Sequence, residues 1–413
     1  MKYILVVGDG MADKPVQELN QKTPLQAAVT PNSDRIASAG ELGTVLTVPM
    51  DVAPGTDTAF VGIMGYDVKK RYTGRSPLEA AGMGVELPPG HTAFRCNLVS
   101  ITPEVKLGDA VMLSHSGGQI NGPEGYEIMS WLKGHPRFAE RMRELNIELH
   151  VGTSFRHIVT MGEEYCEAAL EENLKTTPPH EILGEPVRGH LPVGTIAYVL
   201  LDIITLSSEL LPLHPINQRR KNNGEPMANA IWLWGQGYRP EFKPWSELFG
   251  IGGSVVSAVP LVNGIGRLCG LKNITVEGAT GELDTNYDGK ADAAVQALKD
   301  GDDFVLVHLE APDECTHNGD CAGKVEAITR LDKMLGRILG SMDAWGEDYR
   351  LLMLSDHYTT LYNRAHASGA VPYVLYDNRK NAGQQRTFDE QAAEQTGMNI
   401  PSGMQLIPRL LEK

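Results

Sequence analysis

Acids and histidines that could bind a metal ion follow three separate apolar runs of this 413-residue chain. They are Asp9 after residues 2–7, Asp313 and His317 after residues 304–309, and Asp356 and His357 after residues 349–355. Apolar runs of this length predict buried strands. Open α/β sheets place their ligand sites at the carboxyl ends of the strands, and carboxylates and imidazoles are common ligands of divalent cations. The three runs together therefore predict one metal site.

The spacing of Asp313 and His317 supports this interpretation, because residues four apart on a helix point to the same side. One such pair on its own is usually a surface ion pair or a helix cap. The same arrangement at three strand ends favours a metal site over these alternatives.

A hydroxyl group adds to the pattern. Residues 53–60, Ala-Pro-Gly-Thr-Asp-Thr-Ala-Phe, combine a Pro-Gly turn with apolar residues at helical spacing. We expect Thr56 or Asp57 to cap the N-terminus of this helix. Backbone N–H groups at a helix N-terminus favour anions, so a hydroxyl here is well placed to meet a phosphate.

Seven side chains form the candidate ligand set, and all offer oxygen or imidazole nitrogen rather than a thiolate. They are Asp9, Thr56, Asp313, His317, Asp356, His357 and His366. Such donors suit Mn²⁺, Zn²⁺ or Mg²⁺. Seven donors are too many for one tetrahedral ion and suit two ions, which can clamp a transferring phosphoryl group. The set therefore predicts a two-metal site for phosphoryl transfer.

The composition limits the partners and the compartment. The formal net charge of −15 argues against nucleic acid or an anionic membrane as the main partner. The five cysteines are odd in number and form no C-x-x-C pair, which predicts a reducing cytoplasm without disulfides. No stretch approaches the roughly 18 apolar residues of a membrane span. We therefore expect a cytoplasmic protein that acts on a small molecule, with an oligomeric state that the composition does not predict.

Alternating strand-like and helical runs predict an α/β fold with a mainly parallel sheet and helices on both faces. The character changes between residues 86 and 225, where short strands, helices and proline-containing loops follow one another. We interpret residues 1–85 and 226–413 as a metal-binding domain. Residues 86–225 are interpreted as a smaller α+β domain inserted into it.

Short motifs spread over nearly the whole chain resemble those of a known family. They include Gly8-Asp9-Gly10-Met11-Ala12-Asp13, Pro54-Gly55-Thr56-Asp57-Thr58, Ala93-Phe94-Arg95-Cys96-Asn97, His214-Pro215-Ile216-Asn217 and Ala311-Pro312-Asp313-Glu314. With the order of the candidate ligands, they make the sequence similar to the archaeal-type 2,3-bisphosphoglycerate-independent phosphoglycerate mutases of the alkaline phosphatase superfamily. The resemblance implies an alkaline-phosphatase-like fold in which the insertion is a substrate-binding cap.

The resemblance also implies a role for each ligand. The matching residues are Asp313, His317 and His366 for one metal ion, and Asp9, Asp356 and His357 for the other, with the nucleophile's oxygen beside it. The family's usual nucleophile is a serine at position 56, where this chain has a threonine. A threonine hydroxyl can make the same attack. Two divalent ions, Mn²⁺ before Zn²⁺ or Mg²⁺, are the implied cofactors.

Four cations in matching motifs are implied to bind the phosphate and carboxylate of the substrate. They are Arg75, Arg95, Arg156 and Lys290, and the alternative for each is an ion pair or a surface position. The implied reaction interconverts 3-phosphoglycerate and 2-phosphoglycerate through a phosphothreonine, with a cap that excludes water. Two alternatives stay open. Residues 229–235 and 285–287 resemble a branch proposed to act as a homoserine kinase, and a metal-dependent phosphomonoesterase would use the same ligands.

Overall fold

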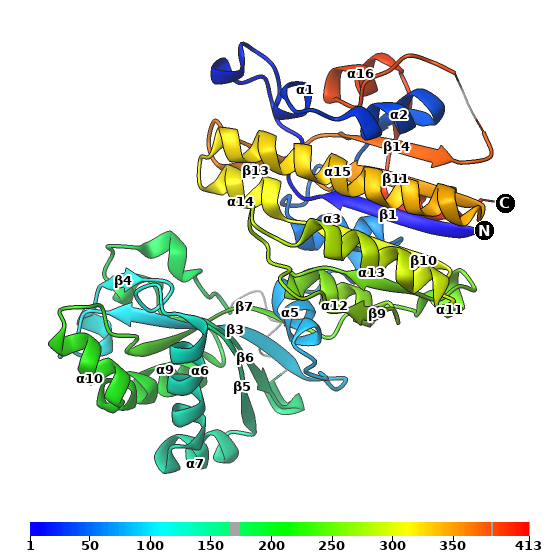
Figure 1. The fold of residues 1–413 in the computed structure, drawn as a ribbon. Helices are drawn as coiled ribbons and strands as arrows, with labels where there is room; N and C mark the ends of the chain where they lie inside the picture. The colour runs from blue at the N-terminus through cyan, green and yellow to red at the C-terminus, as the bar shows by residue number, and fades with distance from the viewer. Residues whose placement is uncertain (166–173, 381–382, 413) are drawn as a thin grey trace. The chain divides into compact units, whose positions relative to one another are not determined.

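The computed structural model describes residues 1–165, 174–380 and 383–412 (Figure 1). The chain forms two compact units, residues 1–72 with 241–413 and residues 73–240. Along the chain, the second unit lies between the two segments of the first.

The second unit spans residues 73–240, whereas the sequence pattern led us to expect an inserted domain over residues 86–225. Helix α5 (Arg75–Gly82) packs against strands β3 (Thr92–Ile101) and β7 (Ala230–Tyr238). Strand β7 also pairs with β3. These tertiary contacts keep both flanking segments in the second unit, and the alternation of helix and strand along the chain could not reveal them.

The first unit is built on an eight-stranded sheet with the order β15-β2-β14-β11-β1-β10-β8-β9. The strands are β1 (Lys2–Gly8), β2 (Glu41–Val45), β8 (Gly253–Val256), β9 (Lys272–Ile274), β10 (Phe304–Leu309), β11 (Tyr349–Ser355), β14 (Val371–Asp377) and β15 (Asn399–Ile400). Neighbouring strands are parallel except where β14 pairs with β11 and β2. The predicted mainly parallel sheet is confirmed.

The central strands are buried on both faces. Side chains alternate between the two faces of a strand. In β1, Ile4 and Val6 join a core with Leu335, whereas Leu5 and Val7 point to the opposite face and are also fully buried. Leu335 belongs to α15 (Cys321–Trp345), which lies with α13 (Tyr287–Lys299) over the face turned to the viewer in Figure 1. Burial on both faces explains why β1 and β10 are almost continuous apolar runs.

Shorter elements complete the first unit. The helices are α1 (Pro24–Ala27), α2 (Pro31–Ala39), α3 (Thr56–Ile63), α4 (Val68–Arg71), α11 (Trp245–Leu248), α12 (Pro260–Leu268), α14 (Ala311–His317), α16 (Glu390–Gln395) and α17 (Leu406–Leu411). Strands β12 (Tyr358–Thr360) and β13 (Ala365–Ala367) form a small antiparallel hairpin. The hairpin follows β11 and was not predicted from the sequence.

The second unit contains an antiparallel sheet in which β4-β3-β6-β5 are neighbours and β7 also pairs with β3. Its other elements are β4 (Met112–Ser114), α6 (Gly122–Gly134), α7 (Pro136–Glu144), β5 (Ile147–Thr153), β6 (Arg156–Met161), α9 (Ala197–Leu210) and α10 (Pro215–Asn222). Helices α6 and α7 are separated just before Pro136, because proline cannot continue the hydrogen-bond ladder of a helix.

Among the described residues, no single helix has the length and apolar character to cross a bilayer. Ala197–Leu213 and Pro215–Asn222 reach that length and apolar character only as a pair, with a 67° bend between them.

Candidate metal centre

The carboxyl ends of three neighbouring strands position the candidate ligands. Strands β11, β1 and β10 are adjacent and parallel, and Gly8 of β1 is in register with both Leu309 and Ser355. Asp9 and Asp356 are therefore the next residues on adjacent strands. After β10 the chain enters α14, which carries Asp313 in its first turn. Segments far apart in the sequence thus deliver their acids to one edge of the sheet.

Asp313, His317 and His366 form the first group of possible metal ligands, with donor atoms all within 4.8 Å of one another. His317 Nε2 lies 3.1 Å from Asp313 Oδ2 and 3.1 Å from His366 Nε2. His366 Nε2 lies 3.6 Å from Asp313 Oδ1. Two imidazole nitrogens and a carboxylate that converge in this way match the donors preferred by divalent metal ions.

Asp9, Asp313 and His357 form a second group within the same 4.8 Å limit. His357 Nε2 lies 3.4 Å from Asp9 Oδ1 and 3.3 Å from Asp356 Oδ2. Thr56 Oγ1 lies 3.3 Å from Asp9 Oδ2 and 3.4 Å from His357 Nε2. Five of the seven predicted side chains thus fall into two adjoining groups that share Asp313, and the other two, Asp356 and Thr56, lie beside His357.

The hydrogen bonds of two histidines fit metal ligation. A backbone carbonyl oxygen can only accept a hydrogen bond, so His317 Nδ1 donates to Arg364 O at 2.9 Å and His366 Nδ1 donates to Pro54 O at 3.3 Å. Nε2 of each ring faces Asp313, to which it donates in the protonated ring; in the neutral ring it carries no proton and can bind a cation. Metal-ligating histidines typically have their second nitrogen fixed in this way.

Thr359 fixes His357 by a similar bond. Its hydroxyl donates to Asp313 Oδ1 at 2.6 Å and therefore accepts from His357 Nδ1 at 3.1 Å. His357 Nε2 is left to face Asp356 Oδ2, a buried oxygen with no hydrogen-bond partner among the described residues. A buried carboxylate oxygen without a donor is costly, and a divalent cation would satisfy both atoms. The residues present therefore fit a metal centre.

The pKa shifts of the three carboxyl groups also indicate a place for a bound cation. Burial, followed by the charges of Asp356 and Asp313, raises the pKa of Asp9 well above its usual value, and burial also raises the pKa of Asp356. Burial opposes the ionisation of Asp313 too, but hydrogen bonds from His317 and His366 hold its pKa well below the usual value. A bound divalent cation would favour the ionised form of all three carboxylates.

Thr56 is the first residue of α3 rather than its cap. Gly55 occupies the N-cap position, where it has no side chain to cap the helix. The Asp57 carboxylate accepts hydrogen bonds from Tyr72 Oη at 2.6 Å and from the backbone N–H of Thr58. The expectation that Thr56 or Asp57 caps α3 is therefore wrong. The physical reason is that the Thr56 hydroxyl turns toward Asp9 and away from the helix backbone.

Two residues beside the ligands were missed by the sequence interpretation. His308 is fully buried in β10, and its Nε2 lies 3.0 Å from Asp9 Oδ2. The available signal was a single histidine in an otherwise apolar run, just before the acid-rich turn. Thr359, which bonds Asp313 and His357, left no sequence signal that separates it from other strand threonines.

Lys290 is only 1 % exposed, and its Nζ donates to the carbonyl oxygen of His308 at 3.1 Å. Burial lowers the pKa of Lys290 to about 8, although the charge of Glu310 opposes this shift. The ammonium group therefore supports the end of β10 from within the first unit. Substrate binding by Lys290 stays a prediction.

The three predicted arginines gather around one acid in the second unit. Arg75 Nε lies 2.8 Å from Glu79 Oε1, and Arg95 Nε lies 2.9 Å from Glu79 Oε2. Burial opposes the ionisation of Glu79, but Arg95, Arg75 and Arg156 together lower its pKa. The Arg95 guanidinium also lies 4.2 Å above the ring of Trp234. Guanidinium groups gathered in this way present donors whose geometry suits a phosphate or a carboxylate.

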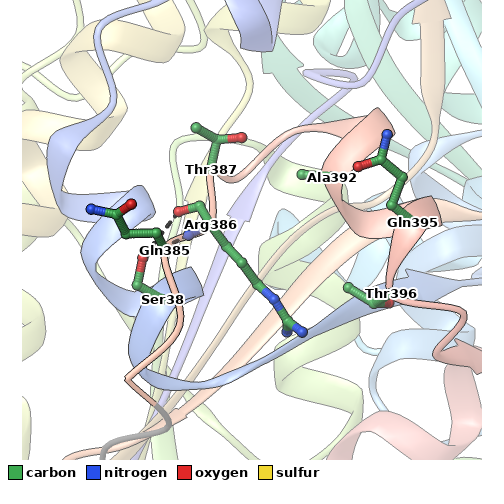
Figure 2. Close-up of a pocket in the computed structure, with 7 residues that line it drawn as sticks. All are labelled: Ser38, Gln385, Arg386, Thr387, Ala392, Gln395 and Thr396. Atoms are coloured by element: carbon green, nitrogen blue, oxygen red, sulfur yellow. Dashed lines mark hydrogen bonds between the residues drawn. The ribbon is translucent and has the colours of Figure 1, made fainter.

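A surface hollow of about 540 Å³ lies elsewhere on the first unit (Figure 2). Its lining includes Ser38, Arg386, Gln395 and Thr396. The lining contains none of the acids and histidines described above, so the hollow is not the candidate active site.

Known proteins resemble the chain over its full length. A family model described as 2,3-bisphosphoglycerate-independent phosphoglycerate mutase matches residues 37–217. A protein of Geobacter sulfurreducens named probable 2,3-bisphosphoglycerate-independent phosphoglycerate mutase is 41 % identical over 416 residues, covering 100 % of both chains. The chain belongs to this family. The mutase of Methanothrix thermoacetophila with the same name is 40 % identical, again over 100 % of both chains.

A solved structure supports the same family fold. The PH0037 protein of Pyrococcus horikoshii is 29 % identical, with a TM-score of 0.80 over 99 % of this chain and 96 % of that one. The predicted α/β fold with its insertion is thus shared with a solved protein. In this mutase family member, the matches span the positions of both the metal centre and the arginine cluster.

Proposed function

We propose that the protein is a cofactor-independent phosphoglycerate mutase that interconverts 3-phosphoglycerate and 2-phosphoglycerate. One observation carries the proposal: the Thr56 hydroxyl lies 3.3 Å from Asp9 and 3.4 Å from His357, beside two groups of possible metal ligands. A nucleophile in this position suits phosphoryl transfer, and the full-length relatives bear the name of this activity.

In the proposed reaction, Thr56 Oγ1 forms a bond to phosphorus while the ester bond to glycerate breaks. The hydroxyl gives up its proton, and the released glycerate oxygen takes one up. The other hydroxyl of glycerate then attacks the phosphothreonine and restores Thr56. Two divalent cations, when bound, would neutralise phosphoryl charge and favour the deprotonated nucleophile. Asp313, His317 and His366 would hold one of them, and Asp9, Asp356 and His357 the other, to which Asp313 would add a further oxygen because it belongs to both groups.

The exposure of the ligands supports an approach of substrate from one side. The side chains of His317 and His366 are 37 % and 24 % exposed. Those of Asp9 and Asp356 are fully buried, and that of His357 is 2 % exposed. We therefore infer that a phosphate reaches Thr56 past the His317 and His366 side of the centre.

The arginine cluster supports a doubly anionic substrate. Phosphoglycerate carries a phosphate and a carboxylate, and both groups suit the guanidinium groups of Arg75, Arg95 and Arg156, which gather around Glu79. Homoserine is a zwitterion with no net charge, because its carboxylate is balanced by an ammonium group, so such a cluster attracts it less than phosphoglycerate. This charge balance favours the mutase over the homoserine kinase alternative.

We also propose that the bound ions are Mn²⁺ and that the enzyme works in the cytoplasm. Mixed carboxylate and imidazole donors suit Mn²⁺, and also Zn²⁺. A reducing cytoplasm is supported by the cysteines, because Cys96, Cys269 and Cys315 are buried free thiols.

The test is a comparison of three substrates with purified protein and Mn²⁺. The samples contain 3-phosphoglycerate alone, homoserine with a phosphoryl donor, or a generic phosphate monoester. Formation of 2-phosphoglycerate supports the mutase. Phosphohomoserine without 2-phosphoglycerate, or free phosphate as the only product, would reject it in favour of the kinase or the phosphatase.

We expect Arg95→Met to raise the KM for 3-phosphoglycerate by about 10- to 100-fold, since one hydrogen bond between charged groups contributes about 1.5–3 kcal/mol. Arg95→Lys should recover only part of the loss, because lysine lacks the planar fork of donors. Steady-state kinetics measure both effects. Arg137→Met is the matched control, because Arg137 pairs with Glu209 on the surface of the same unit. A wild-type KM in folded Arg95→Met protein would remove Arg95 from substrate binding.

A further inference from the structure

His308 connects three elements of the first unit to Asp9. It lies in β10, next to Ser257, which directly follows β8. Its ring meets the ring of Phe60 of α3 edge-on, with centroids 5.2 Å apart. The helix that contributes Phe60 also begins with Thr56. A buried imidazole held from several sides has little freedom to reorient.

The hydrogen bonds around His308 form a chain in which each group donates to the next, from Val259 to Asp9. The backbone N–H of Val259 donates to Ser257 Oγ at 3.0 Å. Ser257 Oγ lies 3.0 Å from His308 Nδ1, so its own proton can be donated to that nitrogen. His308 Nε2 then carries the ring proton and donates to Asp9 Oδ2 at 3.0 Å. The opposite assignment would place an unprotonated nitrogen against a carboxylate oxygen.

This bond determines which part of Asp9 faces the metal centre. With Oδ2 accepting from His308, Oδ1 is directed to His357 Nε2 at 3.4 Å. We propose that His308, itself oriented by Ser257, is a positioning residue that holds the Asp9 carboxylate for metal binding beside Thr56. The inference rests on the metal centre of the proposed function, but not on which substrate the enzyme uses.

A residue that forms a hydrogen bond with a metal ligand holds that ligand in the orientation needed for binding. Loss of such a residue typically lowers metal affinity about 10- to 100-fold. We therefore expect His308→Leu and Ser257→Ala to weaken Mn²⁺ binding by about that range. His308→Gln keeps an N–H donor that can reach Asp9, so it should retain more affinity than His308→Leu. Equilibrium dialysis with free Mn²⁺ measured by electron paramagnetic resonance gives the affinity without any substrate.

Ser254→Ala is the matched control for Ser257→Ala. Ser254 is also a buried serine and lies within β8. Its hydroxyl donates to Asp302, near the end of the β8–β10 pair that lies away from Ser257. We expect Ser254→Ala to change the melting temperature but to keep wild-type Mn²⁺ affinity. Equal affinity in wild type, Ser257→Ala and folded His308→Leu would overturn the proposal, as would an equal loss in the Ser254→Ala control.

If His308→Leu does not fold, Ser257→Ala alone decides, because it removes only one hydroxyl group. The outcome is separate from that of the proposed function. Protein that binds Mn²⁺ but forms no 2-phosphoglycerate would reject the mutase and still reveal whether Ser257 and His308 support the metal.

Discussion

Thr56→Ala should lower kcat for 2-phosphoglycerate formation by on the order of 10⁴-fold or more, since loss of a nucleophile removes the covalent route entirely. The variant should still fold, because among the described residues the Thr56 side chain forms hydrogen bonds only with Asp9 and His357 of the metal centre. It should also still bind 3-phosphoglycerate. A coupled assay of 2-phosphoglycerate and a direct binding measurement check the two expectations.

Thr56→Ser is the matched control for this variant. It keeps the hydroxyl and removes only a methyl group, so it should retain activity within about tenfold of the wild type. Loss of activity in both variants would indicate a role for the methyl group. Full activity in Thr56→Ala would exclude Thr56 as the nucleophile.

Asp313→Asn should strongly reduce both the metal content and the activity, because Asp313 belongs to both groups of possible ligands. We expect the variant to lose both Mn²⁺ ions after gel filtration and to lose activity with them. His317→Ala removes a member of the first group only and should retain one ion per chain. Metal analysis of the purified proteins distinguishes zero, one and two ions.

Asp292→Asn is the control for the loss of a carboxylate, because Asp292 pairs with Arg337 at an exposed position. It should keep both ions. Two ions per chain in Asp313→Asn would show that Asp313 is not a ligand. A single ion would place it in one group and contradict its shared position.

The sequence predicted those parts of the fold that depend on local pattern. The runs before Asp9, Asp313 and Asp356 are buried central strands, and their register could be expected because parallel strands end at one edge of the sheet. The antiparallel strand β14 and the hairpin of β12 and β13 depend on pairing between strands, which residue types alone do not encode. The ends of the second unit, residues 73 and 240, also depend on tertiary packing.

In the candidate site, too, some residues could be predicted from the sequence and others only from the folded structure. Charged or polar residues just after apolar runs could be found by their position in the chain. His308 could not be assigned a role, because a buried histidine in an apolar strand has many possible partners until Asp9 and Ser257 are seen beside it. Lys290 was expected to contact substrate on the strength of its motif, and its bond to His308 O emerges only from the folded chain.

The most direct test of the central claim is to look for the phosphorylated residue. Wild-type protein with Mn²⁺ is mixed with 3-phosphoglycerate, quenched in acid within the first turnovers, digested and mapped by mass spectrometry. We expect to find phosphate on Thr56 in this sample, and no phosphate on Thr56 in samples without substrate or without metal. Phosphate on another residue, or none during full turnover, would contradict this expectation.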